Sequence, residues 1–503
     1  MKSTARLLQT LVVMAAIGQM PSAWAAAAIS EDDLRPHIEI LASDAFEGRE
    51  PGTEGERKTL EYLQAQWKKA GLKAAARDGS WLEPVAMVRR VPVQSSASYH
   101  SGKDRLRLSN EDIVLIGLEA NSETAAMPTI FVGYGVNAQG EVVADVRDKA
   151  VFMLSDRADF LPEKLLSSRS RREALANKGA AAVIAVSGEQ FEFTAIKRQF
   201  QSRPIRLDSN IGHAPIEGAV SSNYMVALVT AAGGDWDKLR LAAKAPDYAG
   251  QLLNSTASFK VETGINRFNS HNIIGKIKGR KSGSGTVMFM GHWDHLGICR
   301  PEGAADRICN GAVDNASGMA VLTEVARSLS RGKHDRDIVF VGTTGEESGL
   351  LGAKAYAAAP TVPLDSIKVL LNVDTIAIAP RGAKVSIIGR GTTPLDGVIE
   401  NVARKLGRTI EPSTEANAFL ERQDGWAFTQ KGVPALMVGG SFADPELLQS
   451  FLDSDYHGPD DEAGSAIELG GAAEDASLHV ELGKYFASNR KFSGTDKAKG
   501  AGE

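Results

Sequence analysis

The apolar positions of this chain predict helices near the N-terminus and alternating strands and helices after Asn272. Leu60, Leu63 and Trp67 recur at helical spacing, and Gly71 ends that run. Residues 29–41 have a similar character, with Ser30 as a plausible N-cap. Four later apolar runs fit buried strands separated by helical segments, at 286–290, 338–341, 369–373 and 435–438. This alternation predicts an α/β fold whose central sheet is mostly parallel, with helices on both faces.

The middle of the chain has a different pattern. Residues 129–132 and 150–154 are predicted to be short strands and residues 171–177 a helix, but no cluster of His, Asp or Glu marks a metal or acid–base site there. We interpret residues 105–260 as a smaller inserted domain, and residues 26–104 and 261–490 as the main domain that it interrupts. The insertion could serve substrate access, partner contact or structure alone.

Both ends of the chain differ from a folded domain. Lys2 and Arg6 precede an apolar stretch at residues 7–17, and small residues flank Trp24, as in a secretory signal peptide occupying residues 1–25. The stretch is too short to span a bilayer comfortably, so we expect export to the periplasm or the medium and no stable membrane insertion after cleavage. Residues 491–503 are rich in Gly, Lys and Ser and are predicted to form a flexible tail.

The composition of the chain bears on its binding partners and on the state of its cysteines. The chain has 503 residues, a formal net charge of -5, and no Lys/Arg run that would follow a phosphate backbone, which argues against nucleic acid. Its two cysteines, Cys299 and Cys309, favour a disulfide in an oxidising compartment, with two free thiols as the alternative. The oligomeric state is unknown from these numbers.

Candidate ligands follow the predicted strands. His292 follows the strand at 286–290, Asp374 the strand at 369–373, and Asp314 precedes a predicted helix at 319–329. Glu346 and Glu347 follow the strand at 338–341, and His457 follows the last strand through a loop. Since sites in open α/β sheets lie beyond the carboxyl ends of the strands, these side chains should meet at one edge.

The donor set indicates two metals. Two imidazoles and three carboxylates are too many for one tetrahedral zinc with an open position, but they fit two zinc ions that share a carboxylate. Two metals about 3.5–4 Å apart can hold a hydroxide between them and polarise a carbonyl. Asp314 alone could be a helix N-terminal charge, Glu346 with Glu347 a solvated pair, and His295 a support for a ligand. Cobalt and manganese also accept such ligands.

At these motifs the chain resembles the di-zinc metallopeptidase family of bacterial leucyl aminopeptidases and glutamate carboxypeptidases. The resemblance lies in residues 41–44, 47–49, 292–297, 314–318, 345–352, 372–374 and 456–457. Residues 133–135 and 178–181 resemble the β-rich protease-associated domain that many members carry as an insertion. The resemblance implies a zinc exopeptidase fold, two zinc ions and peptide substrates.

The resemblance also implies a role for each residue. Asp314 would bridge both metals, His292 and Asp374 would complete one, and Glu347 and His457 the other. Glu346 would be the general base and Asp294 would orient His292. Asp461 would support His457 in a similar way.

These residues lead to three hypotheses about the function. We expect an exported aminopeptidase. A carboxypeptidase or dipeptidase is the alternative and would need a cation such as Arg422 or Arg390 for the substrate carboxylate; a non-catalytic binding protein is more remote. The chain departs from the family pattern at residues 422–426, where many relatives have Ser-Asp-His, and in the long segment 442–454. No counterpart of a tyrosine oxyanion donor is evident.

Overall fold

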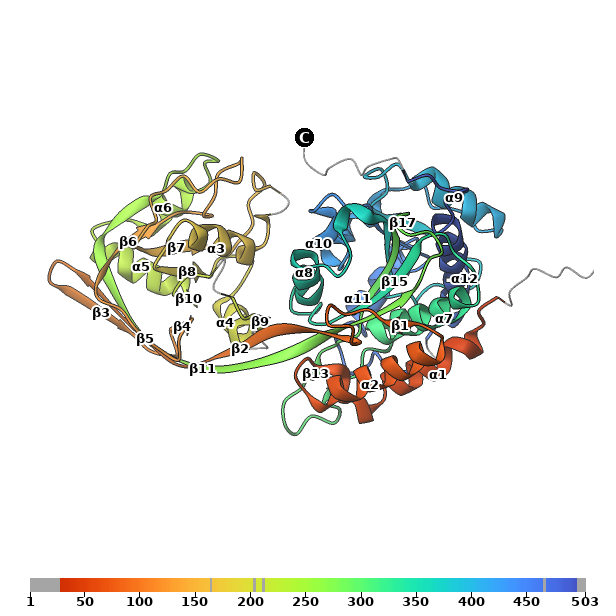
Figure 1. Ribbon diagram of the computed structural model, residues 1–503. Helices are drawn as coiled ribbons and strands as arrows, with labels where there is room; N and C mark the ends of the chain where they lie inside the picture. The colour runs from red at the N-terminus through yellow and green to blue at the C-terminus, as the bar shows by residue number, and fades with distance from the viewer. Residues whose placement is uncertain (1–27, 163–164, 202–204, 210–212, 465–466, 495–503) are drawn as a thin grey trace, which may run out of the picture.

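The computed structural model describes residues 28–162, 165–201, 205–209, 213–464 and 467–494, which form two lobes (Figure 1). Two long strands, β2 (Leu82–Ser101) and β11 (Gln251–Ile277), pair antiparallel and extend from one lobe into the other. A register shift interrupts this pairing between Glu262 and Thr263. The predicted signal peptide and residues 495–503 of the predicted tail lie outside the described residues.

The larger lobe is built on the predicted parallel sheet. Its strands run in the order β11, β15, β12, β16, β18, β17, and the four inner ones are parallel. These inner strands are β12 (Thr286–His292), β15 (Asp337–Thr343), β16 (Ile367–Asn372) and β18 (Ala435–Gly439). β11 and the short β17 (Ser386–Ile388) pair antiparallel at the two sides. The predicted fold class is confirmed, with each inner strand close to its expected range.

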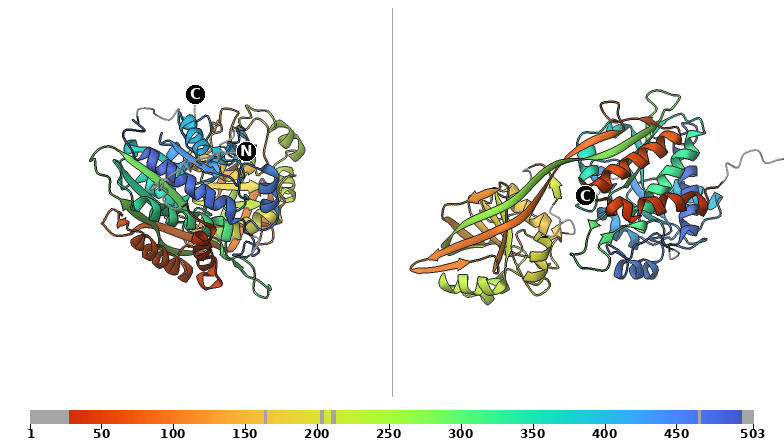
Figure 2. Two further views of the ribbon diagram at one scale, coloured as in Figure 1. Left: turned by 90° about the vertical axis from the view of Figure 1, so that its right-hand side faces the viewer. Right: turned by 90° about the horizontal axis from the view of Figure 1, so that it is seen from below.

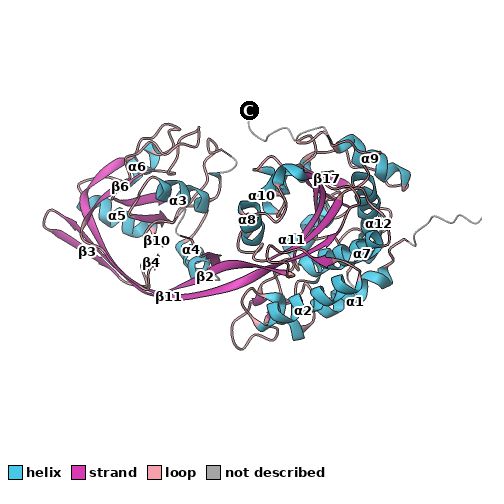
Figure 3. Cartoon of the chain, viewed as in Figure 1, coloured by secondary structure: helices cyan, strands magenta, loops and turns pink. Residues whose placement is uncertain are grey.

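Helices cover both faces of this sheet (Figures 2 and 3). Val287 and Phe289 of β12 belong to the core on one face, while Met288 and Met290 belong to the core on the other. The first face carries α1 (Glu31–Leu41), α2 (Glu54–Lys69), α7 (Gly318–Ser330), α9 (Asp396–Lys405) and α12 (Leu469–Phe486). The second carries α8 (Leu351–Ala358) and α10 (Trp426–Thr429). Burial on both sides explains why these strands are continuously apolar.

The smaller lobe is mixed α/β, whereas the sequence predicted a β-rich domain. Four parallel strands and an antiparallel fifth form its sheet, in the order β6 (Met127–Phe131), β7 (Ala150–Leu154), β8 (Ala182–Val186), β10 (Ile216–Val220) and β4 (Ile113–Gly117). Its helices are α3 (Ser168–Asn177), α4 (Phe193–Gln201), α5 (Ser222–Ala231) and α6 (Trp236–Ala242). Parallel strands need long crossover connections, and α3 and α4 lie in two of them.

Shorter elements complete the chain. They are β1 (Lys73–Ala74), β3 (Asp104–Leu108), β5 (Asn121–Glu123), β9 (Ile205–Leu207), β13 (Gly297–Ile298), β14 (Ile308–Cys309), α11 (Pro445–Asp453) and helical turns at 44–49, 312–317, 364–366 and 415–422. Cys299 and Cys309 form a disulfide across the β13–β14 hairpin. None of the described helices is both long and apolar enough to cross a membrane.

The predicted tail begins with packed residues. Phe492 is buried against the larger lobe, and the guanidinium of Arg336 donates to the carbonyls of Phe486 and Phe492. The prediction of a flexible tail from residue 491 is therefore wrong for its first residues, because composition does not reveal an aromatic anchor among Gly and Lys.

Candidate metal centre

The carboxyl ends of the inner strands bring the predicted ligands together. His292 is the last residue of β12, and its Nε2 lies 3.3 Å from Oδ1 of Asp374, which follows β16. The same Nε2 lies 3.2 Å from Oδ1 of Asp314. These three side chains form one group that could hold a metal ion.

A second group lies on the other side of Asp314. Nε2 of His457 is 2.9 Å from Oε2 of Glu347 and 3.4 Å from Oδ2 of Asp314. His295 also faces this group, with Nδ1 2.6 Å from Oε1 of Glu347 and 4.0 Å from Oδ2 of Asp314. His295 is therefore a residue of this centre whose place the sequence left open, and its only signal is its position three residues after His292.

The spacing of these atoms matches zinc coordination. Two ligands bonded at about 2.0–2.1 Å with tetrahedral angles lie about 3.3–3.4 Å apart. The pairs formed by His292 agree with this edge length, and those formed by His457 straddle it. His295 fits less well, since one of its distances is too short and the other too long.

Several atoms of the second group also lack hydrogen bonds. Among the described residues, Nε2 of His457, Oε1 of Glu347 and both ring nitrogens of His295 are buried and have no hydrogen-bond partner. Buried polar atoms are rarely left in this state, and a cation held by this group would satisfy Nε2 of His457 and the carboxylate of Glu347. The residues present therefore fit a metal.

Asp314 is held between the two groups by the chain around it. It lies in the turn at 312–317, before α7, and its backbone N–H donates to Oδ2 of Asp461 at 3.0 Å. Oδ1 of Asp461 accepts from the N–H of Val313 at 2.8 Å. Asp461 thus fixes the backbone of Asp314, whereas the resemblance had placed it beside His457.

A buried arginine ties the N-terminal segment to the same turn. Arg49 is almost wholly buried, and its guanidinium donates to the carbonyls of Trp293, Leu41, Asn310 and Gly311. Burial lowers the pKa of Arg49 to about 10, although nearby carboxylates, Asp461 first, act to raise it. This gives a structural meaning to the motif at residues 47–49, where the sequence showed a resemblance but no role.

Glu346 and Asp294 lie beside the ligands. The N–H of Glu346 donates to Oδ1 of Asp294 at 3.2 Å, and Nδ1 of His292 lies 3.0 Å from the carbonyl oxygen of Asp294. Burial raises the pKa of Glu346 well above its usual value and raises that of Asp294 to about 8. A carboxyl with a raised pKa can accept and release a proton near neutral pH.

Asp424 belongs to this environment too. It lies in the stretch where the chain departs from its family pattern, is fully buried, and accepts a hydrogen bond from the hydroxyl of Thr343 at the end of β15. Burial raises its pKa to about 6. The sequence pointed to this stretch only as an irregularity.

Tyr456 is the remaining neighbour that the sequence did not assign. Its ring stacks on His457 with centroids 3.7 Å apart, and Nη2 of Arg422 lies 3.5 Å from its hydroxyl. Burial raises the pKa of Tyr456, so the phenol stays protonated and can donate a hydrogen bond.

Comparison with known proteins agrees with this geometry. Residues 272–477, which contain every ligand described above, match the model of peptidase family M28. This segment of the chain is therefore similar to peptidase family M28.

Individual relatives are more distant. The chain is 27% identical over 245 residues to a probable zinc metalloprotease of Pyricularia oryzae, covering 47% of this chain and 45% of the relative. It is 26% identical over 285 residues to leucine aminopeptidase 2 of Trichophyton equinum, covering 50% of this chain and 54% of that one. The chain thus spans about half the length of these relatives. Together with the family match they support a zinc metallopeptidase.

The fold has a counterpart among solved structures. The aminopeptidase from Aneurinibacillus sp. strain AM-1 aligns with a TM-score of 0.54 at 18% identity, covering 92% of this chain and 94% of that one. At this identity the likeness concerns the fold alone.

Proposed function

We propose that this protein is an exported aminopeptidase that uses two zinc ions to hydrolyse the N-terminal peptide bond of peptides. The observation that carries the proposal is Asp314, whose Oδ1 faces His292 while its Oδ2 faces His457. One carboxylate shared between two His-carboxylate groups is the arrangement that a pair of metals requires.

The ligand assignment follows from the distances. His292 and Asp374 would hold one zinc, Glu347 and His457 the other, and Asp314 would bridge them. His295 is the rival for the second metal, but its short approach to Glu347 is better suited to orienting that carboxylate than to binding zinc beside it.

The chemistry divides between metal and protein. When bound, the two zinc ions supply Lewis acidity that activates water and polarises the scissile carbonyl at neutral pH. Glu346 accepts the proton of the attacking water and passes it to the nitrogen of the leaving amine. Asp294 holds the backbone of Glu346, and Tyr456, stacked on His457, would offer its phenol as a donor to the developing oxyanion.

A carboxypeptidase or dipeptidase is the second candidate, and one contact favours it. Arg422 lies beside Tyr456 and so near the second metal group, where it could bind a substrate carboxylate. Arg390, the other cation considered, is paired with Glu400 at 2.5 Å and is already neutralised.

Two further parts of the proposal concern the rest of the chain. The disulfide between Cys299 and Cys309 supports export, because such bonds persist in oxidising compartments. We propose that the smaller lobe corresponds to a protease-associated insertion. Its motif residues 133–135 begin two residues after the end of β6, and residues 178–181 connect α3 to β8.

The variant Glu346→Gln tests the mechanism. It removes the base and leaves all five proposed ligands, so zinc content should stay at the wild-type level while turnover falls about 10²–10⁴-fold. Zinc content and hydrolysis of aminoacyl chromogenic substrates would be measured on the same sample, with the exposed Glu446→Gln as the control. Wild-type turnover in Glu346→Gln would refute the assigned base, and a preference for N-blocked peptides would refute the aminopeptidase.

A further inference from the structure

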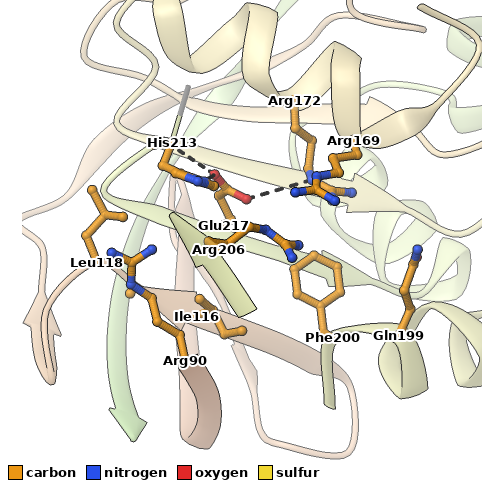
Figure 4. Close-up of a pocket in the computed structure, with 12 residues that line it drawn as sticks. Arg90, Ile116, Leu118, Arg169, Arg172, Gln199, Phe200, Arg206, His213 and Glu217 are labelled. Atoms are coloured by element: carbon orange, nitrogen blue, oxygen red, sulfur yellow. Dashed lines mark hydrogen bonds and ion pairs between the residues drawn. The ribbon is translucent and has the colours of Figure 1, made fainter. Parts of the chain in front are cut away.

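The smaller lobe contains a cavity lined by arginines (Figure 4). It measures about 90 Å³, room for several water molecules or one small oxyanion. Four arginines line it: Arg90 on β2, Arg169 and Arg172 on α3, and Arg206 on β9. We call this the arginine cavity. Glu217 on β10 is the only carboxylate among the described residues that line it.

Two of these arginines are deeply buried and incompletely paired. Arg90 is 3% exposed and Arg172 is 7% exposed. Among the described residues, Nε and Nη2 of Arg90 and Nε of Arg172 have no hydrogen-bond partner. Burying a guanidinium without partners is costly, and an acceptor group in the cavity would offset that cost.

The carboxylates nearby do not balance the arginines. Glu217 accepts from His213 at 3.0 Å and lies 3.9 Å from Nε of Arg172. Glu173 pairs with Arg169 at 3.4 Å, and Asp208 pairs with Arg267, which lies outside the cavity lining, at 3.2 Å. Arg90 and Arg206 have no ion pair of their own among the described residues. The cavity therefore keeps an excess of positive charge.

The apolar lining of the arginine cavity strengthens electrostatic interactions inside it. Ile116, Leu118 and Phe200 supply apolar surface, and the guanidinium carbon of Arg172 lies 5.1 Å from the ring centroid of Phe200. Burial, reinforced by the charge of Arg169, lowers the pKa of Arg206 to about 9. Interactions with an anion are stronger where water is partly excluded.

We propose that the arginine cavity binds an oxyanion, a carboxylate or a sulfate- or phosphate-like group. Guanidinium groups present forked donors that match the oxygens of such anions. Two sources could supply this chemistry: a free anion, or the C-terminal carboxylate of a short peptide held at the metal centre. The second source rests on the proposed function; the first does not.

The cavity lies next to the loop that carries Glu346, Glu347 and Ser348, which we call the catalytic loop. Nη1 of Arg169 donates to the carbonyl of Ser348 at 3.3 Å, one residue after Glu347. On the same side, Met87 of β2 and Ile205 of β9 pack against Leu351 of α8. Arg169 thus connects an anion in the arginine cavity to the segment that carries Glu346 and Glu347.

Binding would be measured directly on the zinc-loaded protein with sulfate as the probe. Sulfate should raise Tm relative to chloride at equal ionic strength. Arg90→Gln and Arg206→Gln should each weaken sulfate binding about tenfold or more, the effect of losing charge-assisted hydrogen bonds. Arg105→Gln, an exposed arginine of β3 in the same lobe, is the matched control.

A second comparison separates the two sources. A free tripeptide and its C-terminal amide would be hydrolysed by wild type and by both cavity variants. A rise in KM for the free peptide alone identifies the substrate carboxylate as the occupant, and unchanged KM values with lost sulfate binding identify a free anion. Equal sulfate shifts in wild type and variants, together with no difference between peptide and amide, would overturn the proposal. The sulfate measurement needs no peptidase activity, so the two proposals can fail separately.

Discussion

The metal centre and the arginine cavity are two buried charged clusters with opposite needs. At the metal centre, carboxylates outnumber imidazoles, and the buried ring nitrogens of His295 and His457 lack hydrogen-bond partners among the described residues. In the arginine cavity, four guanidiniums face one carboxylate. An ion of the opposite sign would compensate the buried charge of each cluster: a cation in the metal centre and an oxyanion in the arginine cavity.

The two clusters are built in different ways. Three of the metal ligands, His292, Glu347 and Asp374, lie at or after the carboxyl ends of adjacent parallel strands, an edge that places distant parts of the sequence side by side. Asp314, in the turn before α7, and His457, after α11, join them there. The arginines come from β2, α3 and β9, elements that are not successive strands of one edge. A site at a sheet edge can be recognised from short motifs, whereas a site assembled from single side chains cannot.

The largest expected effect is at the shared carboxylate. Asp314→Asn keeps the shape of the side chain but removes its charge and one ligand oxygen from between the two groups. We expect loss of most bound zinc and a fall in turnover of about three orders of magnitude or more. Zinc content and turnover would be compared with those of Asp365→Asn, an exposed aspartate. A variant with full zinc and full turnover would contradict the bridging role.

The metal centre and the arginine cavity should differ in how ion binding depends on pH. Burial acts to lower the pKa of His457, but the adjacent carboxylates of Asp314 and Glu347 prevail and raise it to about 10 in the metal-free protein. The pKa of His292 is likewise raised well above its usual value by Asp374 and Asp314 against the effect of burial. Zinc requires both imidazoles neutral, so binding should release protons and strengthen by up to about tenfold per pH unit for each proton.

As the pH rises, the stability that His457 contributes to the metal-free fold decreases, whereas the affinity for zinc increases. Because the folded pKa of His457 is raised, its ion pairs stabilise the metal-free fold fully below about pH 6.5, and that contribution is lost as the pH rises toward 10. Calorimetry in two buffers of different ionisation enthalpy measures the protons released with zinc. Sulfate binding to the arginine cavity should change little between about pH 7 and 8, where guanidiniums stay charged. Zinc binding without proton release would contradict the predicted difference in pH dependence between the two sites.

What the sequence could and could not predict follows the same division. β12, which ends at His292, and β16, which ends two residues before Asp374, are apolar runs buried on both faces, so strand, edge and site were all predictable. The contacts of Phe492 and Asp461 were not predicted, because each joins a remote segment, the guanidinium of Arg336 or the backbone of Asp314. The arginine cavity had no motif, since arginines on a helix or strand are usually solvated.

The smallest effect is expected at Arg169, which touches both regions. Its side chain is 34% exposed and its hydrogen bond to Ser348 is long, so Arg169→Gln should lower kcat/KM no more than about fivefold. The informative measurement is the response to sulfate, which should alter kcat/KM in wild type and less in Arg169→Gln, with Arg105→Gln behaving as wild type. If sulfate acts equally on Arg169→Gln, the cavity and the catalytic loop communicate by another route, of which the packing of Met87 and Ile205 against Leu351 is the nearest. A loss of about 100-fold without sulfate would instead show that Arg169 holds the catalytic loop in place whether or not the cavity is filled.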